Sequence, residues 1–312
     1  MERRSEMGKI AFVFSGQGAQ YSGMGKSLYE LGGEAKKLYD AAEQFRPGTM
    51  SQSFEGSDED LKKTSNTQPC MYLVELAAAL SLNERGIFAD GVAGFSLGEI
   101  GALAYAKAYS YEDGFKMVTK RGEVMNDAST GEETAMCAVL KLDSDTVAKT
   151  AAEYEKLYAV NFNCPGQVTV SGLKSSMDSF TEKVAELGGR CIPLAVSAAF
   201  HSPFMSEASD KFGDALKQFD IKKPEMDVYA NLTGAPYGDD VAETLRLQMK
   251  SPVRWQTTIE NMIADGYTDF IEVGPGKTLC GLIKKISKEV NVYSVEDAQT
   301  LETTAEAVKN NA

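Results

Sequence analysis

The sequence predicts an α/β fold, in which a large α/β-hydrolase-like domain with a parallel sheet carries an inserted small ferredoxin-like α+β domain. Residues 9–14 form an almost continuous apolar run before a glycine-rich turn, which is typical of a strand buried on both faces of a parallel sheet. Residues 94–98 read Gly-Phe-Ser-Leu-Gly and fit the strand-to-helix turn of a nucleophile elbow. Residues 131–196 follow the ferredoxin-like order of strand, helix, strand, strand, helix, strand. We therefore expect residues 1–130 and 197–312 to form the large domain and residues 131–196 the small one.

The composition is that of an ordinary globular protein, because 43% of the 312 residues are hydrophobic and 25% are charged. The 45 acidic and 32 basic residues give a net charge of -13, which argues against nucleic acid or an anionic membrane as the main partner. No apolar run is long enough to span a bilayer, and residues 1–8 are charged and lack the apolar core of a signal peptide. We expect a cytoplasmic protein.

The cysteines and the single histidine limit the chemistry. No two cysteines form a Cys-x-x-Cys pair, so the sequence suggests neither a zinc site nor a disulfide framework, and we expect reduced, mostly buried thiols. His201 is the only histidine, which excludes a metal site that needs two. We expect no metal and no cofactor. The cysteines are Cys70, Cys137, Cys164, Cys191 and Cys280.

Ser96 is the candidate nucleophile. A short apolar strand over residues 91–94 leads to it, and a helical pattern of small residues over 99–109 follows it. Such a turn exposes the serine hydroxyl and places it at a helix start, where free N–H groups favour developing negative charge. The alternative is a serine that merely caps a helix. A serine hydroxyl needs a base to become a nucleophile, and His201 is by far the best candidate.

The glycine-rich turn of residues 15–20 does not fit a dinucleotide loop, because Tyr21 stands at the third glycine position and no acidic residue follows at the expected distance. Its glycines permit either a plain tight turn or the presentation of backbone N–H groups to an oxyanion. Residues 67–69, Thr-Gln-Pro, are expected to begin a helix over 70–82. That helix is apolar all round and therefore predicted to be buried.

Arg121 is the candidate binding residue of a helix predicted from Tyr111 to about Ala128. Val118, Arg121 and Met125 follow one another at spacings of three and four, so the guanidinium lies in line with apolar side chains. One interpretation is a snorkelling side chain or a structural ion pair. The other is a receptor for a substrate carboxylate, which the planar guanidinium can bind with two parallel hydrogen bonds.

Hydrophobic periodicity and turn-forming residues predict the remaining helices and strands. Asn163 begins the hairpin turn of residues 163–166 between the two middle strands of the small domain. Strands are predicted at 134–140, 157–162, 167–171, 191–195, 226–230 and 269–273. Helices are predicted at 144–155, 175–187, 204–219 and 245–249, around 24–31 and 57–63, from 251–255 onward, and after Asp297.

Ordered motifs between about Ile10 and Leu282 resemble the family of malonyl-CoA:acyl carrier protein transacylases and the related acyltransferase domains of polyketide synthases. These motifs are Gly16-Gln17-Gly18, Gln68-Pro69, Gly94-Phe95-Ser96-Leu97-Gly98-Glu99, Arg121, Asn163-x-Pro165-Gly166-Gln167, Ala199-Phe200-His201-Ser202, Gln248, Pro252-Val253-x-Trp255 and Glu272-Val273-Gly274-Pro275-Gly276-Lys277.

The resemblance implies a serine mechanism without an aspartate. Ser96 would carry the malonyl ester, and His201 would act as its general base. The backbone N–H groups of Gln17 and Leu97 would form the oxyanion hole. A backbone carbonyl at Gln248 would orient the imidazole. Malonyl-CoA would bind between the two domains, acyl carrier protein would accept the malonyl group, and no cofactor would be required.

The resemblance also implies the acyl pocket. Arg121 would hold the malonyl carboxylate, and Met125, Phe200 and Asn163 complete the expected substrate site. An aromatic residue before the histidine, as in Phe200, resembles the malonyl-selective form of the family. The chain departs from the family at Phe95, where histidine is usual, which puts in doubt any role of a preceding imidazole.

Docking of an acidic carrier on this acidic chain would need a local basic patch. The candidates are Lys62, Lys63, Lys277, Lys284 and Lys285. Three alternatives stay open: a free-standing acyltransferase of a polyketide pathway, a serine esterase, and a silent scaffold that binds an acidic metabolite. The esterase is disfavoured because an α/β-hydrolase needs a His-Gly-Gly type loop as well as a triad histidine.

Overall fold

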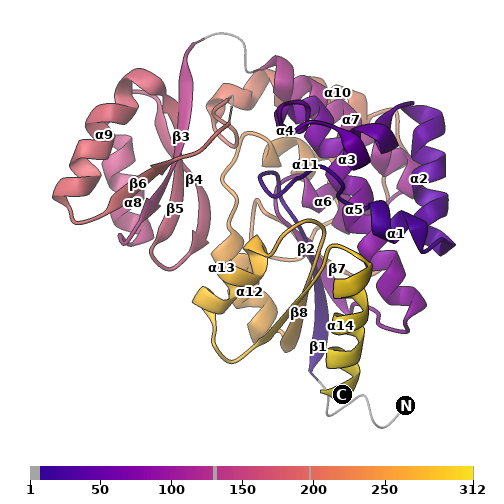
Figure 1. Cartoon of the computed structure of the whole chain (residues 1–312). Coiled ribbons are helices and arrows are strands. Elements are labelled where there is room, and N and C mark those ends of the chain that lie inside the picture. Colours follow the sequence, from indigo (N-terminus) through magenta and orange to yellow (C-terminus); the bar gives the residue numbers. More distant parts are fainter. Residues whose placement is uncertain (1–7, 129–131, 197, 312) are drawn as a thin grey trace.

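The computed structural model describes residues 8–128, 132–196 and 198–311, and it contains two separate sheets (Figure 1). The larger sheet has five strands in the order β7-β2-β1-β8-β9, and all of its pairings are parallel. Its strands are β1 (Lys9–Phe14), β2 (Gly91–Gly94), β7 (Asp227–Tyr229), β8 (Tyr267–Val273) and β9 (Asn291–Val295). The predicted parallel sheet is confirmed, whereas β9 was not predicted.

Helices cover both faces of this sheet. They are α1 (Lys26–Glu30), α2 (Gly33–Phe45), α3 (Thr49–Glu55), α4 (Asp58–Lys62), α5 (Thr64–Glu84), α6 (Gly98–Tyr105), α7 (Tyr111–Asp127), α10 (Ser206–Leu216), α11 (Val241–Gln248), α12 (Trp255–Ala264), α13 (Thr278–Ile286) and α14 (Ala298–Asn310). Phe12 and Phe14 of β1 pack in the cluster that includes α5, α6 and α7, while Ala11 and Val13 pack with α12 and α13. Both faces of β1 are therefore buried, which explains its continuous apolar run.

The smaller sheet is antiparallel, with the strand order β4-β5-β3-β6. Its strands are β3 (Thr134–Leu140), β4 (Leu157–Cys164), β5 (Gln167–Leu173) and β6 (Arg190–Pro193), and its helices are α8 (Ser144–Ala152) and α9 (Lys174–Glu186). This is the predicted ferredoxin-like arrangement. The predicted domain boundaries involve residues 1, 130, 131, 197 and 312, which lie outside the described residues.

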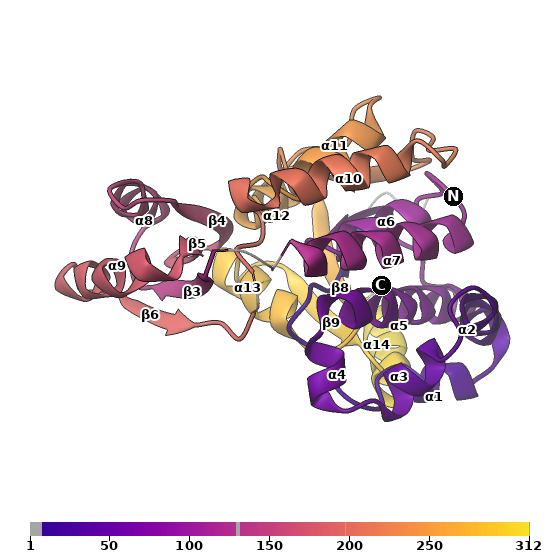
Figure 2. The ribbon, with the colours of Figure 1, turned by 90° about the horizontal axis from the view of Figure 1, so that it is seen from above.

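The two sheets are joined through β4 and by the chain that leaves β6. Val253, just before α12, exchanges backbone hydrogen bonds with Val160 and Phe162 of β4, at 2.8 and 2.9 Å. The Ser171 hydroxyl of β5 donates to the carbonyl oxygen of Phe200 at 3.2 Å. Figure 2 shows the small sheet and its helices extending to one side of the large sheet.

Some element limits differ from the predictions because tertiary packing overrides local signals. Helix α5 begins at Thr64 rather than near residue 70, and Pro69 lies inside it. Thr67 and Gln68 are almost completely buried there. Their packing stabilises a helical turn before Pro69, where the proline by itself predicts the start of the helix. The predicted helix over 204–219 is a 3₁₀ turn, Pro203–Met205, followed by the shorter α10.

The elbow depends on two glycines. A Cβ on Gly94 would lie 2.1 Å from the carbonyl carbon of Gly98, and a Cβ on Gly98 would lie 2.4 Å from the Phe14 carbonyl oxygen. Both contacts are with backbone, which cannot move aside as a side chain can. The glycines thus let α6 begin directly against the ends of β1 and β2.

Replacing Gly94 with alanine should destabilise the fold by about 3 kcal/mol or more, because overpacking against backbone is poorly relieved. Chemical denaturation checks this. Gly281→Ala is the matched control, because no atom lies within 4 Å of a Cβ there. Equal stability of the two variants would contradict the expectation.

Candidate active site

The hydroxyl of Ser96 and the ring of His201 lie within hydrogen-bond distance, although 105 positions separate them in the chain. His201 Nε2 is 2.7 Å from Ser96 Oγ. The φ angles of the two residues are 55° for Ser96 and 58° for His201, which is the left-handed region that non-glycine residues seldom adopt. Such backbone strain is concentrated at functional sites. The distance is short enough for direct proton transfer.

The main chain holds the His201 ring from its other side. Nδ1 is 3.0 Å from the carbonyl oxygen of Gln248, at the end of α11. Because a carbonyl only accepts, this bond places the proton on Nδ1 and leaves Nε2 free to accept from Ser96. Burial, together with the nearby Arg121 guanidinium, lowers the pKa of the imidazole to about 4. The ring is therefore neutral and able to accept a proton at neutral pH.

Arg121, on α7, is fully buried beside Ser96. Its Nη2 atom donates to Ser96 Oγ at 3.1 Å and to Gln248 Oε1 at 2.9 Å, while Nη1 donates to Gln68 Oε1 at 3.0 Å. Within the described residues it neither reaches solvent nor hydrogen-bonds a carboxylate. Burial lowers the pKa of the guanidinium to about 10, so it stays charged at neutral pH. A buried cation without an anion in contact can receive a substrate carboxylate.

The backbone N–H groups of Gln17 and Leu97 are free to bind an oxyanion. Neither donates to a protein acceptor in the described ranges. Leu97 directly precedes α6, and Gln17 lies in the turn after β1, where its side chain donates to Thr64 Oγ1 at 3.3 Å. The N–H of Ser96 itself is taken, because it donates to Asn231 Oδ1 at 2.7 Å.

Two further residues hold the elbow, and the sequence analysis gave them no role. Asn231 follows β7, and its Nδ2 atom donates to the carbonyl oxygen of Gly94 at 2.6 Å. Glu99 is fully buried on the first turn of α6, and burial raises the pKa of its carboxyl to about 7. A lone acidic residue within a helix of small apolar residues was the only sequence signal for Glu99.

Phe95, the residue before Ser96, acts by packing. Its ring meets the Trp255 ring edge-on, with the centroids 5.5 Å apart. Gly16 makes room for it, because a Cβ there would lie 2.8 Å from Phe95 Cδ1. Phe95 therefore links the turn after β1 to α12 and supplies no titratable group beside Ser96.

Met125 and Phe200 adjoin this group of residues. Met125 Sδ accepts from Gln68 Nε2 at 3.3 Å, so it touches the residue that also holds Arg121. Phe200 is 7% exposed and directly precedes His201. Met125 is thus linked to Arg121 through Gln68, and Phe200 is linked to His201 through the chain.

Asn163 lies apart from the other predicted site residues. It is on β4 and 6% exposed, and its Nδ2 atom is 3.4 Å from Thr169 Oγ1. Its Oδ1 atom is buried without a hydrogen-bond partner. No bond joins it to Ser96, His201 or Arg121 in the part of the chain that the structure describes.

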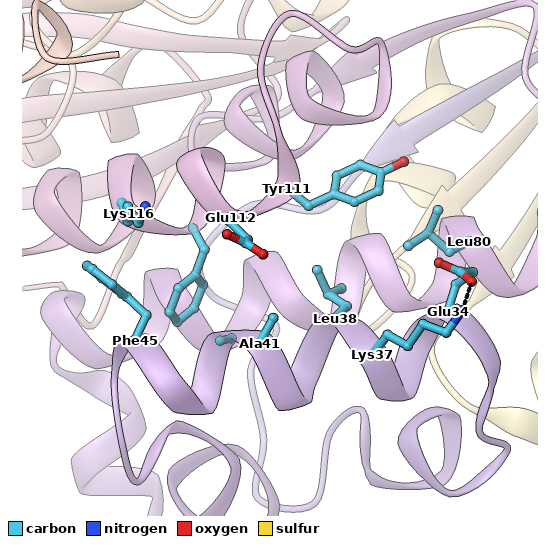
Figure 3. Close-up of a pocket in the computed structure, with 11 residues that line it drawn as sticks. Glu34, Lys37, Leu38, Ala41, Phe45, Leu80, Tyr111, Glu112 and Lys116 are labelled. Carbon is cyan, nitrogen blue, oxygen red and sulfur yellow. Dashed lines mark hydrogen bonds and ion pairs between the residues drawn. The ribbon is translucent and has the colours of Figure 1, made fainter. Parts of the chain in front are cut away.

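Two hollows differ in their relation to the site. One, of about 390 Å³, is lined by Ala199, two residues before His201, and by residues of α7, β3 and α10. The other, of about 180 Å³, is apolar and lies between α2, α5 and the first turns of α7 (Figure 3). No residue that holds Ser96, His201 or Arg121 lines the second hollow. Only the first adjoins the histidine-bearing segment.

Three of the five cysteines are buried, in agreement with the prediction of mostly buried side chains, and none of the five is paired in the described part of the structure. Among residues 8–128, 132–196 and 198–311, no cluster of three histidine, cysteine or acidic side chains is placed to bind a metal ion. The same residues include no helix with the length and apolar character to cross a membrane.

Comparisons with known proteins show which family the chain belongs to. The family described as acyl transferase domain matches residues 11–310. The malonyl CoA-acyl carrier protein transacylase of Bacillus subtilis is 40% identical over 311 residues, which cover 97% of this chain and 98% of that protein. The crystal structure of the transacylase of the same name from Clostridium perfringens has a TM-score of 0.93 and 36% identity, over 97% of this chain and 98% of that one. A malonyl-transacylase solved in complex with a type II PKS acyl-carrier protein has a TM-score of 0.91 and 29% identity, over 96% and 99%.

The chain therefore belongs to the acyl transferase family, within its branch of malonyl CoA-acyl carrier protein transacylases. It is an acyltransferase enzyme. The resemblance inferred from the ordered motifs is confirmed.

The low pKa of His201 can be measured directly, because the chain has one histidine and its ring gives one set of NMR signals. The midpoint of titration should lie near pH 4 in the folded protein, where burial and Arg121 disfavour the charged ring. In urea-unfolded protein it should lie near about 6.5. A folded-state midpoint at or above the unfolded value would contradict the described burial.

Proposed function

We propose that this chain moves a malonyl group from malonyl-CoA to the pantetheine thiol of acyl carrier protein through a malonyl ester of Ser96. The observation that carries the proposal is the convergence on one hydroxyl: Ser96 Oγ is 2.7 Å from His201 Nε2 and 3.1 Å from Arg121 Nη2. A base and a buried cation at one nucleophile suit an acyl group with a carboxylate close to its carbonyl. Malonyl has this arrangement.

In the first half of the reaction, Ser96 Oγ attacks the thioester carbonyl while His201 Nε2 takes the hydroxyl proton. The tetrahedral intermediate carries its negative charge toward the N–H groups of Gln17 and Leu97, each worth ~3 kcal/mol in the transition state. The carbon–sulfur bond then breaks, and the imidazolium returns its proton to the leaving thiolate of coenzyme A. In the second half, the carrier thiol loses its proton to His201 Nε2 as its sulfur attacks the ester carbonyl. The carbon–oxygen bond to Ser96 then breaks, and the imidazolium returns the proton to Ser96 Oγ.

The acyl pocket has Arg121 as the carboxylate receptor. A carboxylate that takes over the Nη2 bond now made to Ser96 Oγ would free the hydroxyl for attack. Gln68 would keep its bond to Nη1 and hold the fork in place. Phe200, beside the base, would leave little room for an α-methyl branch, and Met125 would complete the apolar wall. Asn163 is proposed as a more remote contact to the substrate.

No cofactor is proposed, because both ends of the transfer are thioesters and the exchange is nearly neutral in free energy. We propose a cytoplasmic enzyme, as the composition predicts. We also propose that residues 131–196 form an inserted domain, on the support of an apolar cluster made only of residues between 135 and 191. The substrate would bind between this domain and the rest of the chain.

The pathway has two candidates. The relatives from Bacillus subtilis and Clostridium perfringens are named malonyl CoA-acyl carrier protein transacylases, which favours fatty acid synthesis. The structure with a type II PKS carrier keeps a polyketide pathway as the second candidate. An esterase is disfavoured by the buried Arg121. A lipase or esterase binds an uncharged, apolar acyl chain, and a cation in the acyl pocket does not suit such a chain.

Intact mass spectrometry after mixing with malonyl-CoA should show one malonyl adduct on the wild type and none on Ser96→Ala. The adduct should persist until a carrier thiol is added. The bound carrier holds its thiol next to the ester carbonyl, whereas a water molecule is not held there for attack. Release of free malonate without a carrier would indicate an esterase instead. An adduct on Ser96→Ala would reject Ser96 as the nucleophile.

Arg121→Ala should lower malonyl transfer by about a hundredfold or more, because two charge-assisted hydrogen bonds worth ~1.5–3 kcal/mol each are lost. Acetyl transfer from acetyl-CoA should fall much less, because acetyl has no carboxylate. The ratio of the two kcat/KM values measures the effect. An unchanged ratio would show that Arg121 is not the carboxylate receptor.

Two of the proposed docking lysines, Lys63 and Lys277, adjoin residues that contact the turn carrying Gln17. Lys63 precedes Thr64, whose hydroxyl bonds to Gln17, and Lys277 follows Gly276, whose Cβ position would be 3.1 Å from that of Ala19. Lys284 is less available, because its Nζ atom donates to the Val290 carbonyl oxygen at 2.5 Å. Lys62, Lys63, Lys277 and Lys285 are exposed.

Lys62→Glu combined with Lys277→Glu should raise the KM for the carrier protein several-fold and leave acylation by malonyl-CoA unchanged. The physical reason is repulsion between the new carboxylates and an acidic carrier. Lys309→Glu, at an exposed position in the last turn of α14, is the control. An unchanged KM for the carrier would reject this docking surface.

A further inference from the structure

Glu99 has no role in the mechanism above, yet three donors converge on its carboxylate. It is fully buried, three residues beyond Ser96. Its Oε2 atom accepts from the backbone N–H of Asn231 and from Nε2 of Gln248, both at 3.0 Å. Its Oε1 atom accepts from the hydroxyl of Tyr237. The carboxylate thus joins α6, α11 and the segment after β7 directly beneath the elbow.

The side-chain amide of Gln248 connects Glu99 to Arg121. Nε2 donates to Glu99 Oε2 at 3.0 Å and to the carbonyl oxygen of Ser96 at 2.8 Å, while Oε1 accepts from Arg121 Nη2 at 2.9 Å. If the amide turned over, its NH₂ would face the guanidinium and its oxygen would face two acceptors, so all three bonds would be lost. An ionised carboxylate can only accept, so Glu99 in its ionised form fixes which end of the Gln248 amide faces Arg121.

Glu99 is also the counter-charge of the buried guanidinium. Burial lowers the pKa of the Arg121 guanidinium, and the negative charge of the Glu99 carboxylate acts in the opposite direction, favouring the ionised guanidinium. The Gln248 amide stands between the two charges, so they balance without touching. A direct ion pair would occupy the guanidinium fork, whereas this bridged pair leaves Arg121 able to bind a substrate carboxylate.

We propose that Glu99 is a positioning residue: through the Gln248 amide it holds the Arg121 guanidinium toward the acyl group and so sets the preference for acyl groups that carry a carboxylate. The inference rests on the proposed role of Arg121. Glu99 itself does not touch Ser96 Oγ or the His201 ring. Its loss should therefore weaken the transfer of carboxylated acyl groups more than acyl transfer in general.

The test is Glu99→Gln. This substitution keeps the shape of the side chain, removes its negative charge, and replaces one acceptor oxygen by an NH₂ donor. For acylation of Ser96, kcat/KM with malonyl-CoA should fall about tenfold, which corresponds to a barrier higher by ~1.4 kcal/mol. With acetyl-CoA, kcat/KM should fall less than about twofold. Should Glu99→Gln not fold, as judged by circular dichroism, Glu99→Asp replaces it. That variant withdraws the carboxylate by one methylene, and the same fall in the malonyl-to-acetyl ratio is expected.

Glu75→Gln is the matched control. Glu75 is a fully buried carboxyl on α5, packed against Gly101 of α6, and neither of its oxygens has a hydrogen-bond partner among the described residues. Burial raises the pKa of Glu75 well above its usual range, so Glu75→Gln replaces a buried neutral carboxyl by an amide of the same shape. Because Glu75 has no link to Gln248, the malonyl-to-acetyl ratio of this variant should match the wild type.

Three outcomes decide the inference. A lower ratio in Glu99→Gln, with a wild-type ratio in Glu75→Gln, supports it. An unchanged ratio in Glu99→Gln, or an equal loss on both substrates as a merely structural role would give, overturns it. Arg121→Ala separates the two proposals: if that variant lowers the ratio and Glu99→Gln does not, only the present inference fails. If Arg121→Ala leaves the ratio unchanged, the proposed role of Arg121 fails first.

Discussion

Burial of the Arg121 guanidinium is the constraint on which the arrangement of the site depends. A buried cation needs acceptors for its N–H groups, and here two glutamine side chains and the Ser96 hydroxyl supply them. The same desolvated space contains His201, so the guanidinium charge helps to keep the imidazole neutral. A cation for the substrate and a free base for the serine therefore follow from one environment.

The carboxyl ends of neighbouring parallel strands bring the reacting groups together. Ser15 and the Gln17 turn follow β1, the elbow follows β2, and Asn231 follows β7. Because β1, β2 and β7 are adjacent in the sheet, these segments meet at one edge without long loops. Helix α6 can begin against that edge only because Gly94 and Gly98 carry no side chain.

His201 reaches the same edge from the small sheet. The chain that leaves β6 is tied to β5 through the bond between Ser171 and the Phe200 carbonyl, one residue before the histidine. On its other side, Gln248 at the end of α11 fixes the ring through a carbonyl oxygen. The base is therefore positioned by contacts from both parts of the molecule, which explains how a histidine in a strained turn can be held in one orientation.

Local pattern and residue type alone predicted the buried strand β1, the glycine elbow around Ser96, the ferredoxin-like order and the choice of His201, which is the one histidine of the sequence. They did not find β9, an edge strand whose residues are mostly part-exposed and lack a continuous apolar run. They also placed the start of α5 at a proline, since the burial of Thr67 and Gln68 is not visible locally.

Only the tertiary structure decided the network of Glu99, Gln248 and Arg121. The bond between Glu99 and Gln248 joins residues 149 positions apart, and the one between Arg121 and Gln248 spans 127. No periodicity or spacing encodes such pairs, because they form when α6, α7 and α11 pack at one end of the sheet. The sequence could therefore point to Ser96 as the candidate nucleophile and to His201 as its candidate base, while the orientation of the Arg121 guanidinium arises from packing between distant helices.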